Sequence, residues 1–342
     1  MEKRADYDLA FLLRYENVAW YEEGKVRILD RRVYPMETRF VTCERHEEVA
    51  QAIADMVTQS YGPYTAAAMG MVLAAFESKD MREIERMEYL KKAAYTLSHA
   101  RPTTSAKMER IVGGAVALAE KTDSKDLVDV LFEYAFKKID DTYKSYIQVG
   151  KYLADLIPAG GTVMTQCYAD TVIGTTLRAL RESGKEAKFI CPETRPYFQG
   201  SRLTASVICD MGFDVTVISD NMPGYVLKEK NVDIFTSAAD VITVDGHVVN
   251  KVGTFQIALA ANYWGIPYFV TGNPDPAHKD ISNIRIEQRN SMEVMCALDK
   301  KVTMEGVKGF YPAFDITPPH LCSGVVTDKG VIPPFCLDRY FK

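Results

Sequence analysis

Five short runs of β-branched and aromatic residues recur in the second half of the chain and restrict its fold more than any other feature. They begin at Thr162, Lys188, Asp214, Asp240 and Tyr268, about 26 residues apart, and a stretch of helical character follows each of them. This spacing is typical of repeated βα units, because the crossover between two parallel strands needs a connection of helix length. The sequence therefore predicts an α/β domain with a parallel sheet and right-handed crossovers.

The first part of the chain has a different pattern. In residues 17–45, short apolar runs alternate with charged residues and are interrupted by Gly and Pro, which predicts a small antiparallel sheet. Further along, apolar residues recur at three- and four-residue spacing, which predicts helices, with one long helix over 124–157. The break at Pro158–Gly161 ends this pattern. We predict two domains: a mostly helical N-terminal domain with a small β region, 1–150, and an α/β domain built on the parallel sheet, 151–342.

Polar and reactive side chains follow each predicted strand. In open α/β sheets, ligands bind beyond the carboxyl ends of the strands. The functional residues are therefore expected in five segments: Gln166–Asp170, Pro192–Arg202, Ser219–Pro223, Asp245–Lys251 and Thr271–Pro276. None of them contains a G-x-G-x-x-G or a G-x-x-x-x-G-K-[ST] motif, which disfavours a classical dinucleotide or P-loop nucleotide site.

Two of these residues are candidates for chemistry. Cys167 lies between a strand and a helix, and a helix N-terminus favours the thiolate and lowers the pKa of a thiol. A buried cysteine that only packs is the alternative. Asp240 lies among apolar residues at the start of the fourth predicted strand, where a carboxylate is costly unless it is paired or functional. The alternative is an aspartate that hydrogen-bonds the neighbouring backbone.

The junction Glu193–Ala205 is unusually polar for the end of a strand and the start of a helix. Arg195 and Arg202 suit a forked pairing with a phosphate, and Gln199 suits sugar hydroxyls. An Arg–Glu network that holds the loop together, or that contacts a partner subunit, explains the same residues equally well. The residues of this junction alone do not decide between the two.

Two more segments predict anion binding. Asn250 and Lys251 come just before a predicted helix, and the free N–H groups at a helix start bind anions. Arg101 lies beside another predicted helix start, at Pro102–Thr104. An arginine with a structural role is the alternative at that position.

The composition narrows the function classes. The formal net charge of −5 disfavours nucleic acid as the main partner, and no apolar run is long enough to predict a membrane span. The seven cysteines are scattered, without a C-x-x-C pair or a Cys/His cluster at metal-ligand spacing. This pattern predicts reduced thiols in a cytoplasmic protein and no structural zinc site. No small-residue cleavage site follows the apolar N-terminal patch, so we expect no signal peptide.

Several motifs occur together in the order that one family shows. They are VAWYEEGKVRILDRRVYP, ARPTT, GGTVMTQC, ETRPYFQGSRLTA, AADVITVDGHVVNKVGTFQIALAA, IRIEQRN and FDITPPHLCSGVVTDKGV, and they cover nearly the whole chain. The chain resembles the methylthioribose-1-phosphate isomerase family. The superfamily of that family includes ribose-1,5-bisphosphate isomerase and the regulatory subunits of the translation-initiation guanine-nucleotide exchange factor.

The resemblance implies a helical N-terminal domain on a Rossmann-like C-terminal domain, usually in a homodimer. It implies an aldose–ketose isomerase that acts on S-methyl-5-thioribose 1-phosphate, or on a close 5-substituted pentose 1-phosphate, without a nicotinamide or metal cofactor. Cys167 and Asp240 would be the catalytic pair. Carried over by motif, the substrate contacts would be Arg101, Gln199, Asn250 and Lys251. Glu193, Arg195 and Arg202 are then expected to support the pocket or to contact another subunit.

The chemistry of such a substrate assigns roles to the pair. The phosphate on C1 locks the sugar ring, so the ring must open before C2 reacts, and a protonated Asp240 would assist this opening. A Cys167 thiolate would move a proton from C2 to C1 through an enediol. If hydrogen moves directly as hydride, Cys167 would only polarise or position the substrate.

One segment departs from the family. An Arg-Gly-Ala-Pro phosphate loop is expected after the first long helix, and Thr58–Tyr61 stands there without an arginine. The alternative substrates are therefore 5-deoxyribose 1-phosphate and ribose 1,5-bisphosphate. A non-catalytic protein that binds sugar phosphates or nucleotides is the alternative from another class. The presence of both Cys167 and Asp240 speaks against it.

Overall fold

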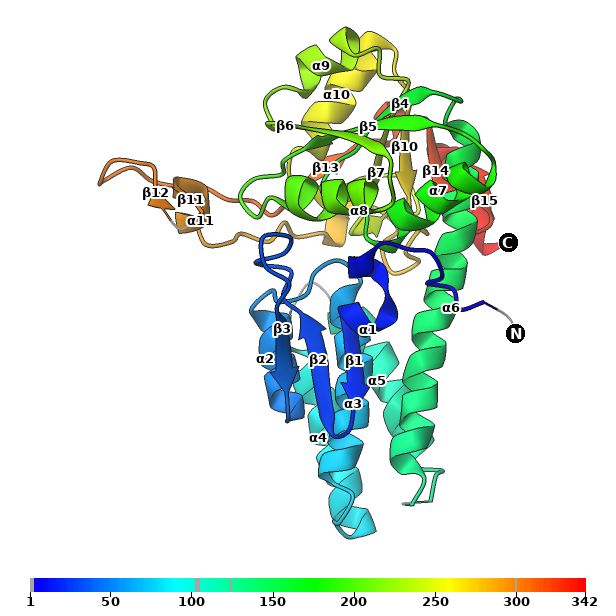
Figure 1. Ribbon diagram of the computed structural model, residues 1–342, viewed down its shortest axis with the longest axis vertical. Helices are drawn as coiled ribbons and strands as arrows, with labels where there is room; N and C mark the ends of the chain where they lie inside the picture. The colour runs from blue at the N-terminus through cyan, green and yellow to red at the C-terminus, as the bar shows by residue number, and fades with distance from the viewer. Residues whose placement is uncertain (1–2, 102–104, 124, 299) are drawn as a thin grey trace. The chain divides into compact units, whose positions relative to one another are not determined.

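The chain forms two compact units, Met1–Lys144 and Ser145–Lys342 (Figure 1). The computed structural model describes residues 3–101, 105–123, 125–298 and 300–342. The boundary between the units falls inside one long helix, α6 (Leu127–Leu156), which the sequence predicted as a single helix. Among the described residues, no helix is long and apolar enough to cross a membrane.

The first unit combines a small sheet with a set of helices. The strands β1 (Ala19–Glu22), β2 (Lys25–Leu29) and β3 (Phe40–Cys43) pair antiparallel in that order, as predicted. The shorter helical elements are η1 (Phe11–Leu13) and α1 (Tyr15–Val18). The longer helices before α6 are α2 (His46–Ala54), α3 (Gly62–Glu77), α4 (Glu83–Ser98) and α5 (Ser105–Ala119).

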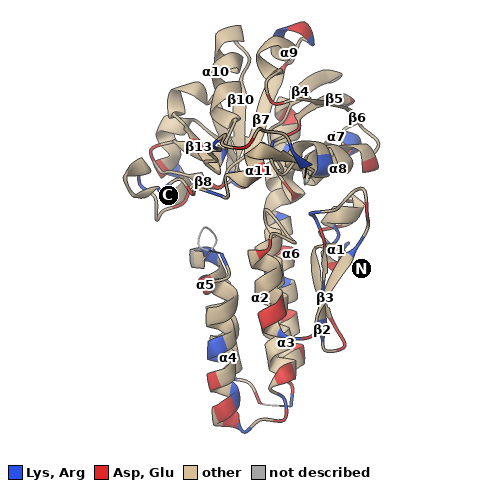
Figure 2. Cartoon of the chain, turned by 90° about the vertical axis from the view of Figure 1, so that its left-hand side faces the viewer, with Lys and Arg blue, Asp and Glu red and all other residues tan. Residues whose placement is uncertain are grey.

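Helix α3 is the core of the first unit. It is rich in alanine, and nearly all of its residues from Gly62 to Ala75 are buried, because other elements pack on every side of it. At Gly70, an added Cβ would lie 2.8 Å from the Leu97 side chain of α4, so the glycine permits close packing of the two helices. Acidic and basic residues both occur along α4 (Figure 2), as expected for a helix with one solvated face.

The second unit is built on a seven-stranded sheet. The strands, in spatial order, are β15 (Gly330–Ile332), β14 (Gly324–Thr327), β10 (Tyr268–Thr271), β7 (Ile234–Ala238), β4 (Gly161–Met164), β5 (Ala187–Pro192) and β6 (Asp214–Ile218). All neighbouring strands are parallel except β14 and β15. The order of the strands reverses between β4 and β7, and α/β sheets bind ligands at such a switch point.

Helices connect these strands, and a small second sheet adjoins them. The helices are α7 (Thr171–Glu182), the π-helix η3 (Gly200–Thr204), α8 (Ala205–Asp210), α9 (Pro223–Glu229) and α10 (Thr254–Trp264). The small sheet has the order β13 (Phe314–Thr317), β9 (Val248–Lys251) and β8 (Val241–Ile242), and it is antiparallel. The remaining elements are η4 (Ile281–Asn283), α11 (Met292–Met295), β11 (Cys296–Ala297), β12 (Lys300–Lys301), η5 (Pro319–Leu321) and η6 (Pro334–Phe341).

One predicted strand was wrong. The run that begins at Asp240 does not form the fourth parallel strand, which is β7, Ile234–Ala238. Two apolar segments follow each other here, and the first four residues of β7 are buried on both faces of the sheet. The second segment turns back at Gly246, which has φ 93°, and forms β8 and β9. Asp240 therefore follows a central strand instead of beginning one.

Candidate functional site

The loop between β4 and α7 leaves the sheet at the switch point. Cys167 has φ 58° and Asp170 has φ 49°, so two of its non-glycine residues have left-handed backbone conformations. Such conformations cost of order 1–3 kcal/mol each and gather at functional sites. The Thr204 hydroxyl donates a hydrogen bond of 2.5 Å to the Cys167 carbonyl and holds the loop against η3. The strained loop fixes the backbone that carries the thiol.

A pocket lies beside Cys167 in the second unit. Its lining consists of Leu153, Thr165, Gln166, Cys167, Ala169, Val172, Ile173, Thr204, Thr236, Ser237 and Thr271. The hydroxyls in this lining donate hydrogen bonds within the protein, for example Thr236 to the Phe269 carbonyl at 2.8 Å and Thr271 to the Ser237 carbonyl at 3.2 Å. The pocket therefore combines apolar walls with a thiol and a carboxamide.

The ionisation of Cys167 differs from the prediction. Burial raises the pKa of the thiol to about 11, and the negative charge of Asp240 adds to this rise. The positive charges of Lys251 and Arg289, with the Tyr168 backbone N–H, act in the opposite direction and are outweighed. The prediction that the start of α7 lowers the pKa of the Cys167 thiol was wrong, because desolvation of the thiolate outweighs the effect of the helix start. Cys167 carries a neutral thiol at neutral pH.

Asp240 lies directly after β7, beside the loop that follows β4. Its backbone N–H donates to the Val249 carbonyl at 2.9 Å, and the residue is exposed. The prediction of a carboxylate embedded among apolar residues was therefore wrong, for the same reason that the strand was misplaced. The structure nevertheless brings the two candidate catalytic residues to the ends of the two neighbouring central strands, β4 and β7.

Lys251 is a buried cation. Its side chain is at the end of β9, only 4% of the residue is exposed, and its ammonium lies 5.0 Å from the centre of the Phe314 ring. Burial lowers the pKa of the ammonium, while the charge that Cys167 can carry and that of Asp240 act in the opposite direction. Within the described part of the chain, the ammonium forms no ion pair or hydrogen bond. Asn250 is also buried, and its amide donates to Thr254 at 3.0 Å.

The start of α10 already has an anion. The Asp315 carboxylate accepts hydrogen bonds from the backbone N–H groups of Gly253, at 2.6 Å, and Phe255, at 3.1 Å. Burial raises the pKa of Asp315 to about 6, although these bonds favour its charged form. The sequence predicted anion binding at this helix start, and the anion is a side chain of the protein itself.

Gln199 lies at the start of the π-helix η3, a type of element that is frequent at functional sites. The residue is 5% exposed, and among the described residues its Oε1 has no hydrogen-bond partner. The following Gly200 is required, because a Cβ there would lie 1.8 Å from the Pro192 carbonyl oxygen. The close approach of the two segments fixes the position of Gln199.

The arginines around Gln199 bond to the protein. The Arg195 guanidinium donates to the Cys296 carbonyl at 2.5 Å, and its backbone N–H donates to the Asp220 carboxylate at 2.6 Å. Arg202 donates to the Tyr197 carbonyl at 3.3 Å. These contacts agree with the expected supporting role of both arginines.

Arg289 is a buried residue that the sequence analysis did not assign. Its Nε donates to Glu287 at 2.9 Å, and its guanidinium lies 5.6 Å from the rings of Tyr197 and Phe314. Its Nη1 is buried without a hydrogen-bond partner in the described chain. The residue lies in the IRIEQRN motif, which was the one signal in the sequence that could have identified it.

Arg101 belongs to the first unit, whereas the other five candidate residues belong to the second. Pro102–Thr104, which the sequence analysis placed at a helix start, lie outside the described residues. In the same unit, the segment Thr58–Tyr61 is held by an arginine from elsewhere in the chain. The buried guanidinium of Arg31 donates to the Gln59 carbonyl at 2.7 Å.

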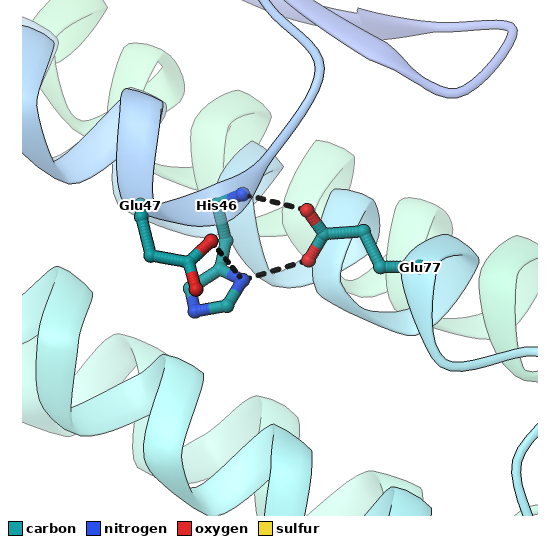
Figure 3. Close-up of side chains that lie close together, drawn as sticks. All are labelled: His46, Glu47 and Glu77. Carbon is teal, nitrogen blue, oxygen red and sulfur yellow. Dashed lines mark hydrogen bonds and ion pairs between the residues drawn. The ribbon is translucent and has the colours of Figure 1, made fainter.

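One group of three potential metal ligands lies close together among the described residues: His46, Glu47 and Glu77 (Figure 3). The Glu77 carboxylate accepts from the His46 backbone N–H at 2.9 Å, lies 2.7 Å from Nδ1 of the same ring, and accepts from the Tyr89 hydroxyl at 2.8 Å. Nε2 of His46 is buried without a partner. The contacts join α2, α3 and α4, which explains the cluster as part of the helix packing.

The fold and the site define a class of protein, and comparison with known proteins agrees. The initiation factor 2 subunit family matches residues 59–334, and the chain belongs to this family. The methylthioribose-1-phosphate isomerase of Fervidobacterium nodosum is 36% identical over 337 residues, which cover 94% of this chain and 96% of the relative. That of Thermotoga neapolitana is 33% identical over 335 residues, with the same coverage. The predicted methylthioribose-1-phosphate isomerase family, and with it an isomerase enzyme, is confirmed.

Two solved structures have the same fold. The 5-methylthioribose 1-phosphate isomerase from Pyrococcus horikoshii has a TM-score of 0.87 and 29% identity, and the match covers 100% of this chain and 99% of that one. The translation initiation factor eIF-2B subunit delta from A. fulgidus has a TM-score of 0.82 and 31% identity, covering 93% and 96% of the two chains. The predicted fold class, with a helical N-terminal part and a Rossmann-like C-terminal part, is confirmed.

Proposed function

We propose that the protein converts S-methyl-5-thioribose 1-phosphate, or a close 5-substituted pentose 1-phosphate, to the corresponding ribulose 1-phosphate. One observation carries this proposal: Cys167 and Asp240 follow the two central strands at the switch point of the sheet, and Cys167 lines a pocket there. Relatives with this activity in their names match nearly the whole chain.

The neutral thiol supports a division of roles that differs from the one expected from the sequence. In our scheme the Cys167 thiol gives its proton to the ring oxygen as the bond between that oxygen and C1 breaks. Hydrogen then passes from C2 to C1 as hydride. The Asp240 carboxylate takes the proton of the C2 hydroxyl as the ketone forms. Proton return from Asp240 to Cys167 resets the pair. An enediol route would need a base at C2, and the thiolate left on Cys167 by the first step would be that base.

The buried polar groups around Cys167 support the binding part of the proposal. Lys251 supplies a positive charge for the phosphate, and its burial strengthens the attraction because water does not screen it. Gln199 and Asn250 supply carboxamides for hydroxyls or phosphate oxygens. On the family resemblance alone, we also propose Arg101 as a substrate contact. We also propose that the active form is a homodimer, which sedimentation velocity would test.

The test of the function is a panel of pentose 1-phosphates, with the ketose product followed by NMR. The panel includes the 5-methylthio, 5-deoxy and 5-phosphate substrates. Cys167→Ser should lower turnover by roughly 10²–10⁴-fold, the usual contribution of an acid–base group. Cys209→Ser is the matched control, because Cys209 is exposed on α8. Full activity of Cys167→Ser would remove the thiol from the mechanism.

A binding or regulatory protein is the second candidate. The specific observation in its favour is the similarity to the eIF-2B subunit delta structure, which is 31% identical, against 29% for the isomerase structure. If the protein is a binding or regulatory protein, calorimetry should detect binding of sugar phosphates or nucleotides, while no pentose 1-phosphate of the panel is converted. Turnover of any member would exclude it.

A further inference from the structure

Gln166 is a buried carboxamide with one bonded end and one free end. It directly precedes Cys167, lines the same pocket, and is 3% exposed. Its Nε2 donates to the Val252 carbonyl at 3.3 Å. In the described chain, its Oε1 is buried and has no hydrogen-bond partner. The hydroxyl side chains of the pocket lining all have partners, so this oxygen differs from every hydroxyl around it.

The orientation of the carboxamide follows from its surroundings. If the amide were turned over, its oxygen would face the Val252 carbonyl, and two acceptors would repel each other. The neighbouring Gly253 leaves room for the amide, because a Cβ there would lie 3.0 Å from Nε2. Oε1 is therefore the end that remains free for a ligand. A buried acceptor without a donor costs about 1–3 kcal/mol, which a ligand with a suitable donor would recover.

The chemistry of the free oxygen restricts what can bind it. A carbonyl oxygen accepts hydrogen bonds and donates none. A phosphate dianion has no proton to offer, so the free end of Gln166 does not suit the phosphate of a sugar phosphate. A hydroxyl does suit it. Lys251 has the opposite character, since an ammonium only donates. The two residues therefore select different parts of one ligand.

We propose that Gln166 is a specificity-determining residue whose carboxamide oxygen accepts a hydrogen bond from the C3 hydroxyl of the substrate. This inference rests on the proposed function and deepens it. In the proposed reaction, the C2 hydroxyl loses its proton and the ring oxygen gains one. The C3 hydroxyl stays a donor from substrate to product and adjoins the reacting carbon. A hydrogen bond to it fixes the sugar ring beside Cys167, the next residue along the chain.

The experiment combines a protein variant with a substrate variant. Gln166→Met keeps the length of the side chain and removes the amide. With the pentose 1-phosphate that the unmodified protein converts fastest, Gln166→Met should lower kcat/KM about 10-fold, the value of one neutral hydrogen bond. With the 3-deoxy analogue of that substrate, the unmodified protein and Gln166→Met should have equal kcat/KM. An equal loss on both substrates, or no loss on either, overturns the proposal.

A matched control is available in the same segment. Thr171, the first residue of α7, also has a buried hydroxyl without a partner in the described chain, but it does not line the pocket. Thr171→Val should leave the ratio of the two kcat/KM values unchanged. A change in this ratio as large as that of Gln166→Met would make the effect one of loop structure and overturn the proposal.

A second variant covers the case in which Gln166→Met does not fold. Gln166→Glu, when protonated, has the same shape as glutamine, donates to the Val252 carbonyl and keeps an acceptor towards the pocket. Because a carboxyl group offers an acceptor oxygen in both protonation states, Gln166→Glu should keep the preference for the parent substrate over the 3-deoxy analogue, and loss of this preference overturns the proposal. The failure of the proposed function is seen separately, because the unmodified protein would then convert no pentose 1-phosphate at all.

Discussion

Two buried polar clusters, one in each unit, differ in how their hydrogen bonds are satisfied. In the first unit, both oxygens of the Glu77 carboxylate accept hydrogen bonds from the residues around them (Figure 3), and Nε2 of His46 is the one buried side-chain atom of this described cluster without a partner. In the second, Oε1 of Gln166 and Oε1 of Gln199 are buried without partners in the described chain, and the ammonium of the buried Lys251 lies near aromatic rings. Unpaired buried groups reduce stability, so the first arrangement indicates a structural role and the second indicates a ligand.

The largest effect that tests this comparison is expected at Lys251. Lys251→Met keeps the length of the side chain and removes a buried ammonium that has no partner ion. We expect kcat/KM to fall about 10–100-fold, as for the loss of a charged hydrogen bond. The free energy of unfolding should rise, because a desolvated charge no longer has to be buried. Product NMR and urea unfolding measure the two quantities.

Lys228→Met is the matched control for Lys251. Lys228 is exposed, and its ammonium also lies near an aromatic ring, 4.7 Å from the centre of Trp264. It should change neither activity nor stability by much. If Lys251→Met lowered both activity and stability, Lys251 would have a structural role like that of Glu77. The contrast between a structural cluster in the first unit and ligand-binding groups in the second would then be wrong.

At Glu77 we expect the reverse outcome. Glu77→Ala leaves the His46 backbone N–H without its acceptor and removes the nearest partner of the His46 ring and of the Tyr89 hydroxyl, and should lower the free energy of unfolding by about 2–3 kcal/mol. The kcat/KM of the folded protein should stay the same. Urea unfolding measures the free energy of unfolding, and product NMR on the same samples measures kcat/KM. Glu47→Ala is the control, because Glu47 is 43% exposed, and it should change stability by less than about 0.5 kcal/mol.

Much of the fold could be predicted from the sequence, because its signals are local. The runs that became β4, β5, β6 and β10 are bounded by turn residues and recur at a regular distance, and the long helix α6 has a continuous apolar period. The strand β7 could not be told from the segment after it. Both are apolar, and which of them enters the sheet depends on packing against β4 and β10.

The candidate site was predicted in position but not in its electrostatics. The motifs identified both Cys167 and Asp240, and the structure has Cys167 after the end of a strand, as predicted. Asp240 was predicted at the start of a strand and instead follows β7. The pKa of Cys167 was predicted with the wrong sign, because the field of a helix start is a local property while desolvation is set by the whole domain. Gln166 and Arg289 lie in the motifs GGTVMTQC and IRIEQRN, but the sequence does not single out their unpaired atoms, because an unpaired atom is defined only by the groups around it.

The smallest effect is expected at Asp315, which shares a feature with each cluster. Its carboxylate accepts hydrogen bonds at the start of α10, as Glu77 does in the first unit, and burial destabilises its charged form. Its pKa in the folded protein, about 6, is above the usual value near 4. Between about pH 4 and 6 the folded state therefore binds more protons than the unfolded state, and stability falls as the pH rises. Above pH 6 this contribution is constant.

Asp315→Asn keeps an oxygen for the backbone N–H groups and removes the titration. The free energy of unfolding of the unmodified protein, relative to this variant, should fall by on the order of 1 kcal/mol between pH 4.5 and 6 and then stay level. Urea unfolding at a series of pH values measures it. Asp280→Asn is a control of opposite sign, because hydrogen bonds from Ser282 lower the pKa of Asp280. If the difference in free energy of unfolding between the unmodified protein and Asp315→Asn did not change with pH, the hydrogen bonds to Asp315 would fully compensate its burial. The start of α10 would then have a structural role like that of the Glu77 cluster.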